Sequence, residues 1–150
     1  MRVFNGMNIS ASALTAQRFR MDVISSNMAH AETTRADFVN GEWQPYRRKM
    51  VDLEPVSGSF NGYLNKAMKE SSTPGKGVRV RAVVEDETPF KMVYNPDHPD
   101  ANVDGYVAMP NVDPLKEMVD LMSATRSYEA NVTAFNATKG MMMKALEIGK

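Results

Sequence analysis

Residues 113–148, which read DPLKEMVDLMSATRSYEANVTAFNATKGMMMKALEI, carry the longest regular pattern in the chain. Asp113 is suited to cap a helix, and Pro114 to occupy its first position, where a missing N–H costs nothing. Side chains suited to a helix seam then recur at alternating spacings of three and four, with Lys139 interrupting: Met118, Leu121, Thr125, Tyr128, Val132, Phe135, Met142 and Leu146. The pattern predicts one helix from Pro114 to about Ile148, roughly 50 Å long at 1.5 Å per residue.

A helix of this length is too long for the rest of the chain to cover. A compact chain of 150 residues has a radius of gyration of about 15 Å, so the helix would protrude and its apolar stripe would pack against other molecules. Tyr128, Glu129 and Asn131 are expected to fix the register of that packing, because buried polar groups must find partners. The predicted assembly surface of this helix is Met118, Leu121, Tyr128, Glu129, Asn131, Val132, Phe135, Met142 and Leu146.

The N-terminal segment predicts a second helix. Residues 8–31 contain neither proline nor glycine, and Asn8 can cap a helix just after the breaker Gly6. Leu14, Met21 and Met28 lie seven residues apart, with polar or apolar residues at the intermediate seam positions. The predicted assembly surface of this helix is Leu14, Gln17, Met21, Ile24, Asn27 and Met28, with Asn27 as a polar determinant of register.

The middle of the chain changes period and composition. It holds most of the proline and glycine, and short segments alternate as half-buried strands do. The predicted strands are residues 46–53, 78–84, 90–94 and 106–109, and residues 54–77 form a flexible loop. The fold class is therefore α+β, with long N- and C-terminal helices forming a coiled-coil-like pair. The predicted organisation is an N-terminal helix (1–36), a small β-rich outer domain (37–112) and a C-terminal helix (113–150).

The composition excludes several functional classes. Eighteen basic and eighteen acidic side chains give a formal net charge of zero, without the electrostatic footprint of a nucleic-acid-binding protein or a polybasic membrane anchor. The chain contains no cysteine, so disulfides, thiolate metal sites and cysteine nucleophiles are excluded. No apolar run approaches the roughly 20 residues that span a bilayer. Residues 1–6 lack the apolar core of a cleavable secretory signal, so these features alone favour the cytoplasm.

No segment predicts catalysis or cofactor binding. The acidic turn around His98, with Asp97, Asp100 and Asp104, lacks the spacing of a calcium loop, and a single histidine makes a poor zinc site. Residues 75–77, Gly-Lys-Gly, are too short for a phosphate-binding loop. We therefore expect no enzymatic activity, no cofactor, no metal and no small-molecule substrate.

The basic run Arg47-Arg48-Lys49 allows two interpretations. It is either a solvated face or a contact with an acidic patch on a neighbouring molecule. Both interpretations place these side chains at the surface of the chain.

Several blocks of the sequence, in a fixed order, resemble one protein family. They are residues 16–29 (AQRFRMDVISSNMA), 45–49 (PYRRK), 77–80 (GVRV), 94–102 (YNPDHPDAN), 105–112 (GYVAMPNV), 117–122 (EMVDLM) and 126–132 (RSYEANV). Together they resemble the axial proteins of the bacterial flagellum, which form its rod, hook and filament. Within that family, the blocks resemble most strongly the proximal-rod subunits of the basal body.

The resemblance implies a structural subunit whose terminal helices polymerise into a hollow drive shaft that transmits torque and passes exported subunits. It implies as partners copies of the same chain, other proximal and distal rod proteins, the inner-membrane ring and export-gate junction, and the flagellar type III export apparatus. It also implies a place in the rod within the periplasm, reached by type III export without a cleaved signal peptide. This location overrides the cytoplasmic expectation.

Two alternatives to a proximal-rod subunit stay open. The first is another rod subunit of the same family, against which the block from residue 94 to 112 is the most discriminating. The second is a soluble helical adaptor that never polymerises, against which the β-rich insertion counts.

Overall fold

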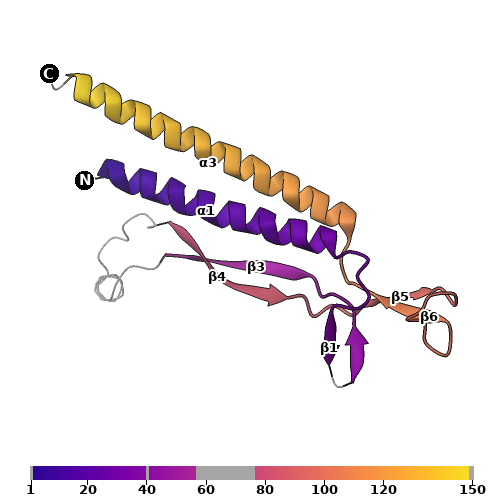
Figure 1. Ribbon diagram of the computed structural model, residues 1–150. Helices are drawn as coiled ribbons and strands as arrows, with labels where there is room; N and C mark the ends of the chain where they lie inside the picture. Colours follow the sequence, from indigo (N-terminus) through magenta and orange to yellow (C-terminus); the bar gives the residue numbers. More distant parts are fainter. Residues whose placement is uncertain (1, 40, 57–76, 149–150) are drawn as a thin grey trace. The chain divides into compact units, whose positions relative to one another are not determined.

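The computed structural model describes residues 2–39, 41–56 and 77–148, in which two long helices flank three pairs of short strands along the sequence (Figure 1). The helices are α1 (Arg2–Ala29) and α3 (Pro114–Ile148). This is the predicted α+β fold, with a long helix at each end and small antiparallel strand pairs between. None of the described helices is long and apolar enough to cross a membrane.

Each strand pair is a separate two-stranded sheet. The pairs are β1 (Asp37–Val39) with β2 (Glu42–Gln44), β3 (Lys49–Pro55) with β4 (Val78–Glu85), and β5 (Lys91–Tyr94) with β6 (Tyr106–Met109). The first and third pairs are antiparallel, with Phe38 opposite Trp43 and Tyr94 opposite Tyr106. Two-stranded sheets have little capacity to bury side chains, so they depend on other elements for stability.

The chain forms two compact units, each described here by itself. The first unit comprises Met1–Phe19, Asp52–Ala82 and Ala124–Lys150, and the second comprises Arg20–Val51 and Val83–Ser123. Both helices, as well as β3 and β4, contribute to both units. This division differs from the one predicted at residues 37 and 113, which stays a prediction.

In the first unit, a glycine and a serine fasten the start of β4 to helix α1. The Ser12 hydroxyl donates to the Ile9 carbonyl (2.7 Å) and accepts from the Val78 N–H (3.1 Å). Gly77 has φ +111°, and a Cβ at this position would collide with the Ser12 hydroxyl. Glycine is therefore required here by both the backbone conformation and the available space.

The core of the second unit mixes apolar and polar side chains. Among the described residues of this unit, the buried apolar ones are Ile24, Pro45, Tyr46, Val107, Pro110 and Val112. Asn27, Arg48 and Glu117 are buried beside them. Because charged groups are rarely fully buried unless paired, these polar residues indicate a cluster of side chains that pair with one another.

Helix α3 begins and ends as predicted. The Asp113 carboxylate accepts the Leu115 N–H (3.1 Å), which confirms the cap. Helix α1 differs from the prediction, since it begins at Arg2 and ends at Ala29, so Asn8 is not its cap. Gly6 lies inside α1. A single glycine in a helix interior costs only about 1 kcal/mol, which is too little to end the helix here.

The strand predicted at residues 106–109 is confirmed as β6, whereas the other three strands have bounds that differ from the prediction. β4 extends to Glu85 and β5 begins at Lys91, while β3 covers Lys49–Pro55 and not residues 46–53. The late start of β3 follows from local bonding: the Tyr46 N–H donates to Thr33 and the Arg48 N–H to Asn111, so neither joins a ladder. The predicted loop begins later than residue 54, because β3 reaches Pro55. Residues 57–76 lie outside the described residues. They include Gly75 and Lys76 of the Gly-Lys-Gly segment.

Candidate functional site

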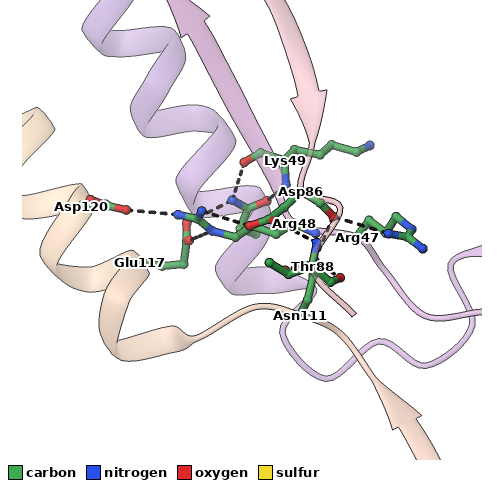
Figure 2. A network of polar contacts seen from close by, with 9 residues as sticks. Arg47, Arg48, Lys49, Asp86, Thr88, Asn111, Glu117 and Asp120 are labelled. Atoms are coloured by element: carbon green, nitrogen blue, oxygen red, sulfur yellow. Dashed lines mark hydrogen bonds and ion pairs between the residues drawn. The ribbon is translucent and has the colours of Figure 1, made fainter. Parts of the chain in front are cut away.

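An ion-pair cluster is centred on Arg48 in the second unit (Figure 2). Arg48 Nε donates to Glu117 Oε1 (2.6 Å), and its Nη2 donates to Asp120 Oδ2 (3.2 Å). Arg48 Nη1 lies 3.6 Å from Asp86 Oδ2. One guanidinium thus meets three carboxylates, which come from α3 and from the segment after β4. We call these four residues and the two amides described below the Arg48 cluster.

Burial makes the charge pairing in this cluster necessary. Glu117 is 0% exposed and Arg48 is 9% exposed. Burial lowers the pKa of Arg48, but the hydrogen bond and charge of Glu117, followed by Asp120 and Asp86, outweigh it and raise the pKa above its usual value. Arg48 therefore stays charged, and the acidic side chains hold it in place.

Asn27 joins helix α1 to the cluster through four hydrogen bonds. Its Nδ2 donates to the Lys49 carbonyl (2.8 Å) and to Glu117 Oε2 (3.0 Å). Its Oδ1 accepts from the Tyr46 hydroxyl (3.1 Å) and the Lys49 N–H (2.9 Å). These bonds use both donors and both lone pairs of the amide, which suits a side chain that is only 1% exposed.

Asn111 makes the corresponding connection from the segment between β6 and α3 (Figure 2). Its Oδ1 accepts the Arg48 N–H (2.7 Å), and its Nδ2 contacts the carbonyls of Asp86 (3.0 Å) and Thr88 (3.2 Å). The backbone N–H of Thr88 in turn donates to Asp86 Oδ1 (3.0 Å). The hydrogen bonds from Thr88, and less so Arg48, lower the pKa of Asp86 below its usual range.

The Arg48 cluster corrects the sequence interpretation of the basic run at Arg48, whereas Lys49 is exposed. Arg48 is neither solvated nor available to a neighbouring molecule, because its partners lie within the second unit. Arg47 packs its guanidinium over the Phe90 ring, 4.5 Å from the centroid, and Lys49 lies over Tyr46. The cluster can fasten five segments together, and its donors and acceptors are engaged in doing so.

The acidic turn around His98 also has a structural role. Asp100 accepts hydrogen bonds from Thr34 and Arg35, and these bonds, that from Arg35 first, lower its pKa. The His98 Nδ1 accepts the Asp100 N–H (3.1 Å). Within the described ranges, no group of three or more histidine, aspartate or glutamate side chains is arranged so that it could hold a metal ion.

Helix α3 exposes a row of large apolar side chains on its first turns. We call this row, Leu115, Met118, Val119 and Met122, the apolar face of α3. Their exposed fractions are 72%, 50%, 54% and 59% respectively. The spacing i, i+3, i+4, i+7 places all four on one side of the helix, and at 100° per residue Glu117 lies on the opposite side.

The last turns of α3 also expose large apolar side chains. These are Met141, Met143, Leu146 and Ile148. Nothing among the described residues covers them by more than about half. At 100° per residue, Met141 and Ile148 share one side of the helix, and Met143 and Leu146 share another. Large apolar side chains exposed at neighbouring positions mark surfaces that meet another molecule.

The predicted assembly residues divide into three groups by burial. Ile24 and Asn27 are buried. The half-buried group is Leu14, Gln17, Met21, Met28, Leu121, Tyr128, Asn131, Val132, Phe135 and Met142. The exposed group is Met118, Glu129 and Leu146.

The polar members of the predicted surface make local contacts. Asn131 Nδ2 donates to the Ser127 carbonyl of its own helix (2.8 Å), and Glu129 pairs with Arg126 (3.4 Å). Gln17 Oε1 is buried, and no described residue donates a hydrogen bond to it. The predicted role of Glu129 and Asn131 in fixing register therefore stays a prediction about the assembled state.

Comparison with known proteins identifies the family. Residues 7–36 match the family described as Flagella basal body rod protein, and residues 103–148 match Flagellar basal body rod FlgEFG protein C-terminal. The chain is 65% identical to the flagellar basal-body rod protein FlgC of Bacillus subtilis, with both chains covered completely. It is 40% identical to FlgC of Salmonella typhimurium over 100% of both chains, and 40% identical to FlgC of Borreliella burgdorferi over 99% of this chain and 98% of that one. The agreement of these full-length relatives decides between the rod-subunit alternatives, and the chain belongs to the FlgC family of structural subunits of the flagellar basal-body rod.

Proposed function

We propose that this rod subunit polymerises through its two terminal helices into the wall of a hollow shaft. The observation that carries the proposal is the uncovered apolar surface of α3, at its first turns and again at its last. An apolar helix face gains free energy when it leaves water, at about 25 cal/mol per Å². Repeated burial of such faces between copies holds a non-closing, head-to-tail assembly together.

The packing surface proposed for assembly consists of the seam residues of both helices. Half-buried members such as Tyr128, Phe135 and Met142 would complete their burial against a neighbouring helix. The buried Gln17 Oε1, which accepts no hydrogen bond from the described residues, favours a polar partner supplied by another chain. Asn131 and Glu129 would then fix the register of the contact.

The proposed partners are copies of this chain, other proximal and distal rod proteins, and the proteins at the inner-membrane ring and export-gate junction. The rod would lie within the periplasm, which the chain would reach through the flagellar type III export apparatus without a cleaved signal peptide. Equal numbers of acidic and basic residues favour self-association, since copies repel each other weakly. A chain without cysteine is also indifferent to the redox state of either compartment.

We also infer that the chain has no catalytic role. Among the described residues, the buried charged groups Arg48 and Glu117 are paired with each other, and Asn27 beside them uses its hydrogen-bonding capacity fully. Such groups have no capacity left to bind or activate a substrate.

The experiment that tests the helix seam is incorporation of a Val132→Asp variant into basal bodies. We expect the variant to be excluded from the rod and motility to be lost, because assembly would bury an unpaired charge. The matched control is Thr133→Asp, which places the same charge at an exposed neighbouring position of α3. Circular dichroism of the purified variants establishes that both fold; a folded Val132→Asp chain that enters the rod normally would refute the seam.

A further inference from the structure

Methionine is the only sulfur-containing residue type of this chain, and much of its sulfur is open to solvent. The chain has thirteen methionines and no cysteine. None of the buried side chains in the described ranges is a methionine. Six described methionines are exposed, and four of them lie on α3: Met118, Met122, Met141 and Met143. These thioethers are therefore accessible to reagents in solution.

Two of the exposed thioethers share one side of α3. Met118 and Met122 lie on the apolar face, and their exposed fractions are 50% and 59%. Residues at the spacing i, i+4 are neighbours on a helix surface. Met141 and Met143 form no such pair, because two steps of 100° turn them about 200° apart around the helix axis. The first turns of α3 thus place two oxidisable groups side by side on a surface that is proposed to be buried on assembly.

The polar side chains that hold the second unit together contain no sulfur. Glu117, on the other side of the same turns, is fully buried and accepts hydrogen bonds from Arg48 (2.6 Å) and Asn27 (3.0 Å). Carboxylate, guanidinium and amide groups lack the thioether that peroxides oxidise to a sulfoxide. A change of Met118 and Met122 alone should therefore leave the Arg48 cluster and the fold intact.

Hydrogen peroxide converts a thioether into a sulfoxide. A sulfur lone pair attacks one peroxide oxygen, the O–O bond breaks, and an S–O bond forms. The hydroxide that leaves takes the remaining proton and becomes water, so sulfur loses two electrons and the peroxide gains them. The product is polar. Burial of a sulfoxide without a hydrogen-bond donor costs free energy, whereas burial of the parent thioether is favourable.

We propose that Met118 and Met122 are an oxidation site, at which peroxide stops the free chain from entering the rod without unfolding it. This inference rests on the proposed function, since it requires the apolar face to be buried in the rod. Leu115 and Val119 supply apolar area on the same face but form no sulfoxide, so the two methionines alone make the face sensitive to peroxide. Methionine sulfoxide reductases reverse the change, and an excluded chain then becomes competent again.

The first test follows the sulfoxides by mass spectrometry. Cells that are building rods receive a sublethal dose of hydrogen peroxide, and the peptide with residues 118 and 122 is compared between unassembled chains and purified basal bodies. We expect sulfoxide in the unassembled chains and about tenfold less in basal bodies for each modified residue. Met92 is the internal control, because it is 55% exposed but lies on β5, outside the proposed seam. Its sulfoxide should be equally frequent in both fractions.

The second test removes the sulfur. Met118→Leu with Met122→Leu keeps the apolar area and forms no sulfoxide. In competition with a tagged unsubstituted chain, this variant should enter rods equally without peroxide and be enriched in them with peroxide, whereas Met92→Leu should gain no advantage. A raised level of methionine sulfoxide reductase should restore the unsubstituted chain, which irreversible damage would not allow.

Four results would overturn the proposal: no sulfoxide at residues 118 and 122 of unassembled chains, equal sulfoxide fractions in unassembled chains and basal bodies, no enrichment of the leucine variant under peroxide, or a loss of helical circular dichroism when the purified chain is oxidised. Val132→Asp, measured in parallel, separates this proposal from the proposed function. If Val132→Asp is excluded while the oxidised chain enters rods normally, the helix assembly stands and the oxidation site is wrong. If both enter normally, the helix seam fails as well.

Discussion

In the first turns of α3, the buried side is polar and the exposed side is apolar, which is the reverse of a usual surface helix. The inward side carries Glu117, which is fully buried and bonded to Arg48 and Asn27. The outward side carries the apolar face, with Leu115 and Met118 at least half exposed. A surface helix ordinarily turns its apolar stripe to the core and its charges to solvent.

This difference separates folding from assembly on one helix. A buried ion pair adds little net stability compared with an apolar core, but it tolerates few alternative arrangements once formed. The apolar side chains, which would ordinarily stabilise the fold, remain available to other molecules. Substitutions on the inward side should therefore change folding, and those on the outward side should change assembly.

The largest effect should come from Glu117→Ala. It leaves Arg48 buried without its main partner, and breaking a buried pair costs about 3–5 kcal/mol. Chemical denaturation of the purified chain measures this loss in the free energy of unfolding. The matched control is Glu129→Ala, whose exposed pair with Arg126 should contribute less than about 0.5 kcal/mol. Equal losses in the two variants would contradict the distinction between the buried and exposed sides.

A smaller loss is expected for Asn27→Ala. The substitution removes four hydrogen bonds and leaves the Lys49 backbone groups without their partner, so we expect a loss of about 2–3 kcal/mol. Tyr46→Phe is the graded control, since it removes only one of the four bonds and should cost about 1 kcal/mol. If Asn27→Ala cost no more than Tyr46→Phe, α1 would not be fastened through this amide.

The sequence predicts the elements with strong local signals. Asp113 and Pro114 place the start of α3, because capping and the fixed φ of proline are properties of adjacent residues. The β1–β2 pair was missed although its signal is present: Asn40-Gly41 is typical of a hairpin turn, and Gly41 has φ +92°.

The Arg48 cluster could not be predicted in the same way. Arg48 and Glu117 lie 69 residues apart in the sequence, and no local pattern reports that distance. The same problem shifts the inward side of α3 from the predicted seam. Met118 looks more suitable for burial than Glu117, yet Glu117 is fully buried and Met118 is 50% exposed. A charged residue can lie on the buried side of a helix only where a residue from elsewhere in the chain pairs with it.

An acid-dependent loss of stability should follow from Asp86. Its pKa is lowered by the hydrogen bonds from Thr88 and then by Arg48, so it stabilises the fold above the carboxyl pKa of the unfolded chain, about 3.9. That contribution is lost as the pH falls through the lower pKa of the folded state. We expect the free energy of unfolding to fall below about pH 4, and Asp86→Asn to reduce this dependence. The pKa of Asp100 is also lowered, so a residual slope in Asp86→Asn should diminish further when Asp100→Asn is added.

The smallest effect on stability should come from the outward side. Met118→Ser with Met122→Ser should change the free energy of unfolding by no more than about 0.5 kcal/mol, since both side chains are at least half exposed in the free chain. The same variant should be excluded from the rod, because it removes the centre of the apolar face. The measurements are chemical denaturation of the free chain and incorporation into basal bodies against a tagged unsubstituted chain.

The matched control for this variant is Met118→Leu with Met122→Leu, which preserves the apolar area and should preserve incorporation. A large loss of stability in the serine variant would mean that the outward side packs within the free chain, and the comparison between the two sides would fail. Unchanged stability with normal incorporation would mean that assembly does not use this face, although water contacts it in every free copy. Only the combination of a stable fold and a failed assembly assigns folding to one side of α3 and association to the other.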